Sequence, residues 1–124
     1  MRALAELLDQ QEPALPLLQS WIGDAAGNGA SLLSPDEVLR ADTLIRLQVT
    51  TRSMLGAIAY ETGGVSVADG LVRLLGSGGS RSLLRAAEVA GCPLDGSYPD
   101  FIIVADDVLG GLFALNGGRF GASG

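Results

Sequence analysis

The sequence predicts an α+β domain with a mainly antiparallel sheet of about five strands, N-terminal helices and one crossover helix between the third and fourth strands. Apolar residues recur at helical spacing through the first 47 residues. Short apolar runs divided by glycine and Asp-Gly turns follow, which is typical of strands joined by tight turns. The chain has 124 residues, of which 48% are hydrophobic. This is enough for one core, so residues 1–124 are expected to form a single domain.

Two helices are expected before residue 25. Leucines lie on one stripe over residues 3–10. A second helix is expected from Pro13, which fits a first helical turn, to about Asp24. Trp21 lies on its apolar stripe with Leu17 and Leu18, which predicts a core position for this side chain.

A third helix is expected to follow Ser34. The segment Ser34-Pro35-Asp36-Glu37 has the form of a capping box, with Ser34 as the N-cap and Pro35 in the first helical position. The helix is predicted to end near Leu44 or Leu47.

The strands are expected over residues 55–61, 65–68, 71–75, 101–106 and 111–115. Asp69-Gly70 predicts a hairpin between the second and third of them. A helix over about residues 81–90 is expected between the third and fourth strands. Ser80 would cap its start, and Gly91 would end it.

Composition excludes several classes of function. The chain has 14 acidic residues, eight arginines, no lysine and no histidine, and its net charge is −6. Nucleic acids and anionic membranes are not expected partners, because both require clustered cations. The absence of histidine excludes a Ser-His-Asp triad, a Cys-His dyad and an imidazole zinc site, and the single Cys92 excludes an internal disulfide. With no signal-like or membrane-spanning run, the cytoplasm is the predicted compartment.

The glycine-rich segment Gly76-Ser77-Gly78-Gly79-Ser80-Arg81 lies between an expected strand and an expected helix. Phosphates dock on helix N–H groups at such junctions. The segment matches neither the Walker loop nor the Rossmann fingerprint, which predicts no tight nucleotide binding. Two interpretations remain: a flexible connection, or a site for a small anionic ligand such as phosphate or a nucleotide, with Arg81 as its cation.

Two polar clusters are further candidate sites. Asp106 and Asp107 end an apolar strand, where neighbouring side chains face opposite sides. Turn chemistry is favoured there over cation binding or partner contact, and no metal or cofactor is predicted. Thr50-Thr51-Arg52 forms either a polar patch for a partner or ligand, or a helix-end cap with Arg52 paired to Glu61 or another carboxylate.

Several segments together carry a family resemblance: Leu4–Leu7, Glu12–Ala14, Leu47–Ser53, Gly56–Gly64, Leu74–Gly78, Val104–Val108 and Phe113–Gly118. In this combination they resemble the bacterial domain-of-unknown-function family numbered 2625. The pattern of strand, Asp-Asp, turn, Gly-Gly and strand is similar to the SUKH superfamily, which includes a fungal cell-wall-synthesis regulator and bacterial immunity proteins that neutralise toxins.

The resemblance implies a SUKH-like α+β fold and protein binding rather than catalysis, with a protein partner, such as a toxin, or a second copy of the chain. Members of the family continue beyond the strand ending near Leu115, so the resemblance also implies a sheet shortened at its C-terminal end. The apolar strand at 111–115 would then be a bare edge without lysine or proline protection. The alternative is that this strand lies inside the sheet.

Overall fold

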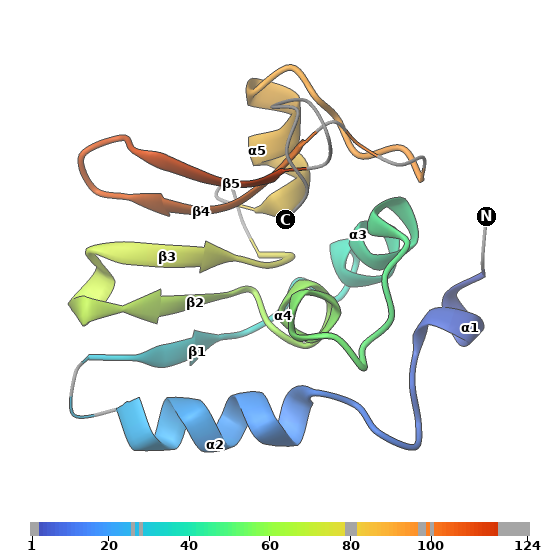
Figure 1. Cartoon of the computed structure of the whole chain (residues 1–124), viewed down its shortest axis with the longest axis horizontal. Helices are drawn as coiled ribbons and strands as arrows, with labels where there is room; N and C mark the ends of the chain where they lie inside the picture. The colour runs from blue at the N-terminus through green and yellow to red at the C-terminus, as the bar shows by residue number, and fades with distance from the viewer. Residues whose placement is uncertain are drawn as a thin grey trace.

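The computed structural model describes residues 3–25, 27, 29–78, 82–96, 99 and 101–116. Within these residues it is an α+β fold with one five-stranded sheet (Figure 1). The α-helices are α1 (Leu4–Leu7), α2 (Leu15–Ala25), α3 (Leu39–Leu47), α4 (Met54–Glu61) and α5 (Leu83–Val89). The strands are β1 (Ser31–Leu33), β2 (Gly64–Val67), β3 (Val72–Leu75), β4 (Phe101–Asp107) and β5 (Leu112–Asn116). The predicted fold class is therefore confirmed.

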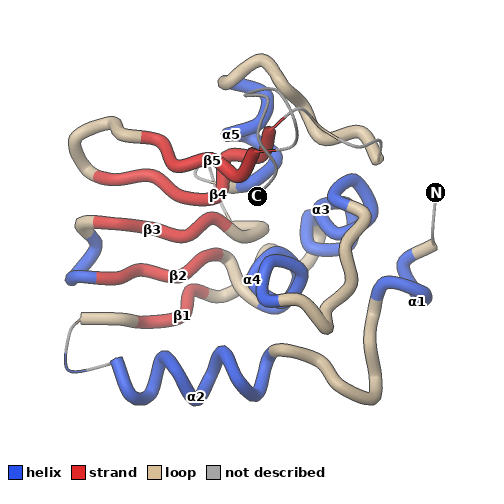
Figure 2. Tube along the Cα trace, in the orientation of Figure 1, coloured by secondary structure: helices blue, strands red, loops and turns tan. Residues whose placement is uncertain are grey.

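The strands follow chain order, β1-β2-β3-β4-β5, and every neighbouring pair is antiparallel. The β2–β3 turn and the β4–β5 turn lie at the same end of the sheet (Figure 2). The backbone N–H of Val108 donates to the carbonyl of Leu71 at 3.1 Å and joins them. The predicted hairpin at Asp69-Gly70 is present. β5 begins and ends one residue later than the predicted strand at 111–115. It lies at the edge of the described sheet and not inside it.

The predicted strand at 55–61 is wrong, because this segment is helix α4. Ser53 has an extended backbone, and its Oγ accepts a hydrogen bond from the Gly56 N–H at 3.0 Å, which is an N-cap. An apolar run of this length fits a buried helix as well as a buried strand. The helix packs closely here, because a Cβ on Gly56 would collide with the carbonyl oxygen of Thr50.

The fifth strand is instead β1, which the sequence did not predict. Its three residues are too short to show an alternating pattern. Pairing with β2 defines it, with Leu32 opposite Val65.

Two helices begin later in the chain than predicted. Helix α3 begins at Leu39 rather than after Ser34, because Asp36 Oδ1 accepts from the N–H groups of Val38 and Leu39 at 2.9 and 3.0 Å. Ser82, whose Oγ accepts from the Arg85 N–H at 3.2 Å, caps α5. The expected cap, Ser80, lies outside the described residues.

The core forms two clusters, and α4 contributes to both. Ile58 of α4 packs with Leu18 of α2 and Val65 of β2. Ala59 of α4 belongs to the other cluster, whose remaining members come from α3, α5, β3, β4 and the loop after α5: Leu47, Leu75, Leu83, Ala87, Leu94 and Ile103. The helix that replaces the expected strand is thus the centre of the packing.

The predicted core position of Trp21 is wrong, since this side chain is 54% exposed. Helix α2 turns Leu18 inward, whereas Leu17 and Trp21, four residues apart, share an outward face. Among the described helices, none is long and apolar enough to cross a membrane.

Candidate functional site

The glycine-rich segment after β3 is a packing junction. Gly76 and Gly78 cross the chain where α4 leads into β2: a Cβ on Gly76 would lie 2.5 Å from the Thr62 carbonyl oxygen, and one on Gly78 would lie 2.8 Å from the Gly63 Cα. Between them, Ser77 is fully buried and its Oγ donates to the Thr62 carbonyl at 3.1 Å. We call residues 62–64 and 76–78 the glycine junction.

The junction accounts for the glycines without a phosphate. Arg73 Nη2 donates to the carbonyls of Gly63 and Gly78 at 3.0 and 3.2 Å, and the Asp36 N–H donates to Ser77 Oγ at 3.3 Å. The first half of the predicted anion loop is therefore occupied by the protein's own groups. Arg81, the predicted cation of that site, lies outside the described residues.

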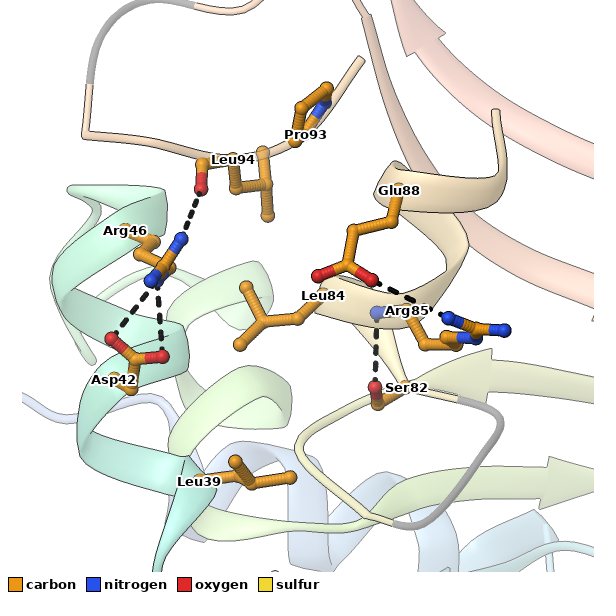
Figure 3. A pocket seen from close by; sticks show the side chains of 9 residues that line it. All are labelled: Leu39, Asp42, Arg46, Ser82, Leu84, Arg85, Glu88, Pro93 and Leu94. Atoms are coloured by element: carbon orange, nitrogen blue, oxygen red, sulfur yellow. Dashed lines mark hydrogen bonds and ion pairs between the residues drawn. The ribbon is translucent and has the colours of Figure 1, made fainter. Parts of the chain in front are cut away.

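A pocket of about 330 Å³ lies between α3, α5 and the loop after α5 (Figure 3). We call it the α3–α5 pocket. Leu84 points from α5 toward α3, whereas the guanidinium of Arg85 points away from it. The pocket is lined by Leu39, Asp42, Arg46, Ser82, Leu84, Arg85, Glu88, Pro93 and Leu94.

The charges around this pocket are balanced and paired. Arg46 Nε lies 3.0 Å from both carboxylate oxygens of Asp42, and its Nη1 donates to the Leu94 carbonyl at 3.3 Å. Arg85 Nη1 lies 3.5 Å from Glu88 Oε2. A pocket with leucines inside and ion pairs around it suits an uncharged group, such as an apolar side chain of a partner.

Two of the predicted site residues line a second hollow, of about 360 Å³. Thr51 and Glu61 line it, and so does Asp9, which lies 3.6 Å from the guanidinium of Arg52. Glu61 does not pair with Arg52. Its Oε2 accepts from Arg40 Nη2 at 3.3 Å, and the Arg40 guanidinium lies 4.1 Å above the Tyr60 ring.

Thr51 fastens the N-terminal segment to the start of α4. It is buried, its Oγ1 accepts from the Asp9 N–H at 2.8 Å, and its N–H donates to the Leu7 carbonyl at 2.9 Å. Its carbonyl accepts from the Ala14 N–H at 2.7 Å. Three hydrogen bonds from one residue to three points of residues 7–14 make Thr51 a clamp, which favours the structural interpretation of Thr50-Thr51-Arg52.

The ion pairs of Arg52 reinforce this clamp. Arg52 Nη2 lies 2.6 Å from Glu12 Oε2, and the Glu12 and Gln11 N–H groups both donate to Asp9 Oδ1, at 2.7 and 2.9 Å. The N–H groups of Glu12 and Gln11 hold the pKa of the Asp9 carboxyl below its ordinary value. Burial opposes this shift in part, and Arg52 adds to it.

Asp106 and Asp107 take separate places. Asp107 Oδ1 accepts from the N–H groups of Leu109 and Gly111 at 3.0 and 2.8 Å, which is the predicted turn chemistry. Asp106 pairs in register with Arg73, in the row next to that of Asp107. No group of three His, Cys, Asp or Glu that could hold a metal ion occurs in the part of the chain that the structure describes.

The exposed apolar surface gathers on one hairpin. Ten large apolar side chains of the described residues are exposed, and five of them lie within residues 108–115. Their exposed fractions run from 47% for Leu115 to 92% for Leu109. We call this set the hairpin surface: Val108, Leu109, Leu112, Phe113 and Leu115.

The sequence predicted an exposed apolar edge over residues 111–115 but not the exposure of Val108 and Leu109, which lie in the turn before β5. It also missed the α3–α5 pocket. The spacing of Asp42 and Arg46, four residues apart on a helix, was the available signal.

The described residues therefore form an α+β fold with a buried glycine junction, two pockets and an exposed apolar hairpin. The family described as "Protein of unknown function DUF2625" matches residues 4–124, and the chain belongs to it. This confirms the resemblance to the family numbered 2625. No solved structure matches the chain.

Two curated relatives carry names that assign no function. An "Uncharacterized protein" of Haemophilus influenzae is 37% identical over 124 residues, covering 98% of this chain and 54% of the relative. The "Putative uncharacterized protein YbfG" of Escherichia coli K12 is 37% identical over 127 residues, covering 98% of this chain and 55% of the relative. The chain therefore spans about half the length of these relatives.

Proposed function

We propose that this chain is a non-enzymatic protein-binding module of the SUKH immunity type, acting on a protein partner in the cytoplasm. One observation carries the proposal: half of the exposed large apolar side chains of the described residues lie on the hairpin surface. Phe113 and Leu115 share one face of β5, and Leu112 lies on the other. Clusters of exposed apolar side chains of this kind mark interaction sites in soluble proteins.

The geometry of the hairpin surface favours a protein over a small molecule. β5 lies at the edge of the described sheet, so alternate residues direct backbone N–H and C=O groups away from β4. A partner strand satisfies such groups by adding to the sheet, and the side chains then supply selectivity. A toxin is the candidate partner that the resemblance to immunity proteins implies.

The test uses the proteins encoded by the genes that flank this one. Each is titrated into the chain by calorimetry, with wild type, Phe113→Lys and Trp21→Lys compared. Trp21 is the matched control, because it is 54% exposed against 49% for Phe113 but lies on α2. We expect one flanking protein to bind, with affinity reduced at least about tenfold by Phe113→Lys and less than about twofold by Trp21→Lys.

Failure of every flanking protein to bind would contradict the proposal, as would binding that both variants weaken equally. Circular dichroism on each variant checks that the fold is retained.

A further inference from the structure

We infer that the occupant of the β5 edge is the same strand of a second copy of this chain, paired antiparallel about Ala114. This goes beyond the proposed function, because it names a second copy as the occupant of the β5 edge whether or not a flanking protein binds to the hairpin surface. In this pairing each Phe113 lies opposite the partner strand's Leu115, and Ala114 lies opposite its own copy. Two such strands join two five-stranded sheets into one continuous sheet across a two-fold axis.

The strand is self-complementary in its side chains. Phe113 and Leu115 are two residues apart, so they lie on one face of β5, and both are about half exposed. Antiparallel pairing about Ala114 therefore places Phe113 of each copy opposite Leu115 of the other, which gives two Phe–Leu pairs. An aromatic ring opposite a branched aliphatic side chain is a favourable cross-strand pair.

The charge pattern favours a second copy over a charged partner. The chain carries a net charge of −6, yet residues 108–118 contain no charged residue. A strand shaped to receive a basic partner would be expected to carry carboxylates, whereas an uncharged strand can meet its own copy without repulsion.

The Asp106 carboxylates of β4 also lie far apart across the proposed β5–β5 pairing. Asp106 stands on β4 opposite Leu112. In the paired sheet the two copies of β4 are separated by three strand spacings, about 14 Å, and by four residues along the strands, about 13 Å. The two Asp106 residues are then about 19 Å apart, more than twice the roughly 8 Å Debye length at physiological salt.

The two edge strands of the described sheet, β1 and β5, differ in what lies beside them, and this difference favours β5 as the strand that pairs with a second copy. Leu32 of β1 packs against the cluster formed by Leu18, Ile58 and Val65, and α2 runs along this side of the sheet (Figure 1). All four residues of β5 from Leu112 to Leu115 are exposed. A single five-residue strand gives a small interface, so we expect weak, concentration-dependent association.

Sedimentation velocity on the 124-residue chain, from micromolar to near-millimolar concentration, tests the inference. We expect the weight-average mass to rise toward twice the monomer mass, with a dissociation constant that changes less than about twofold between low and high salt, because no close charges meet. Phe113→Lys and, independently, Leu115→Lys should leave a monomer, whereas Trp21→Lys should dimerise as the wild type does.

A wild-type monomer at every concentration overturns the inference, and so does a dimer that survives both β5 variants or is lost in Trp21→Lys. If the wild type is monomeric while a flanking protein binds in a Phe113-dependent way, the second-copy inference fails and the proposed function stands. If the chain dimerises through β5 and no flanking protein binds, the inference stands and the proposed function fails.

Discussion

One row of the sheet passes from a covered strand to an open one. Val65 of β2 and Phe113 of β5 stand in the same row, through Leu74 and Ala105, because each pairs with its neighbour in register. Val65 is 1% exposed, Ala105 is 4% exposed and Phe113 is 49% exposed. Strands of similar apolar character therefore differ in what lies over them: α2 and α4 pack on Val65, and nothing among the described residues covers Phe113 to the same degree.

Hydrophobicity along a strand therefore does not determine its burial. The covered region contains the glycine junction, whose composition is typical of an exposed loop, although five of its six residues are buried. The open region contains Leu112 to Leu115, whose composition is typical of a buried strand, although all four residues are exposed.

Truncating one large side chain in each region should give the largest contrast. Leu75 is 1% exposed and belongs to the core cluster with Leu83 and Ile103, so Leu75→Ala should lower the free energy of unfolding by about 2–5 kcal/mol. Phe113→Ala removes a larger group from the open region and should cost about 1 kcal/mol or less, because the ring is half exposed. Urea unfolding at low protein concentration measures both. Equal costs would mean that β5 is covered.

Glycine replacements should separate crowding from backbone strain. Gly76→Ala places a methyl group within 2.8 Å of three backbone atoms, so we expect a loss of about 2–3 kcal/mol. Gly110, in the β4–β5 turn, has φ +88° and open space around it, so Gly110→Ala should cost only about 1 kcal/mol, from the conformation alone.

Gly23→Ala is the control, since this helical position of α2 has open space and an ordinary φ. It should raise stability by up to about 1 kcal/mol. A Gly76→Ala protein as stable as wild type would show that the junction is looser than the geometry indicates.

The Thr51 clamp gives a smaller effect within the covered region. Thr51→Val removes the acceptor of the Asp9 N–H and leaves that donor without its partner, which should lower the free energy of unfolding by about 1–2 kcal/mol. Thr51→Ser keeps the hydroxyl and should cost clearly less. A loss of stability in Thr51→Ser with none in Thr51→Val would assign the effect to the methyl group rather than to the hydrogen bond.

The smallest effect concerns Asp9, whose pKa is lower in the folded protein than its ordinary value of 3.8. A depressed pKa means that the carboxylate contributes stability above pH 3.8 and that this contribution is lost as the pH falls through the folded pKa. Wild type should therefore exceed Asp9→Asn in stability at neutral pH, by an amount that shrinks as the pH falls below 3.8. Unfolding curves from neutral pH to pH 3 measure this, and a difference that grows on acidification would contradict it.

The sequence predicted four of the five strands, β2 to β5, because strong turn signals bound them. It misplaced 55–61, since an apolar run of small residues fits both a buried strand and a buried helix, although Ser53 offered the correct N-cap signal. It missed β1, which is defined only by its pairing with β2.

The role of a candidate site residue was predictable where its contacts are with residues close to it in sequence. Asp107 lies in the turn that its neighbours imply, and the clamp at Thr51 fits one of the two interpretations of that segment. The partners of Arg52 and Glu61 were not predictable, because Asp9, Glu12 and Arg40 reach them only through tertiary packing. The burial of Ser77 likewise depends on a chain crossing that no local pattern encodes.

Hydrogen–deuterium exchange of the β2 and β5 amides, measured on the wild-type chain across protein concentration, tests the open-edge account most directly. β2 lies between β1 and β3 and should stay protected at every concentration. The outward-facing amides of β5 should exchange quickly in dilute solution and become protected as the concentration rises. Protection of these β5 amides that equals that of β2 and does not change with concentration would contradict the account.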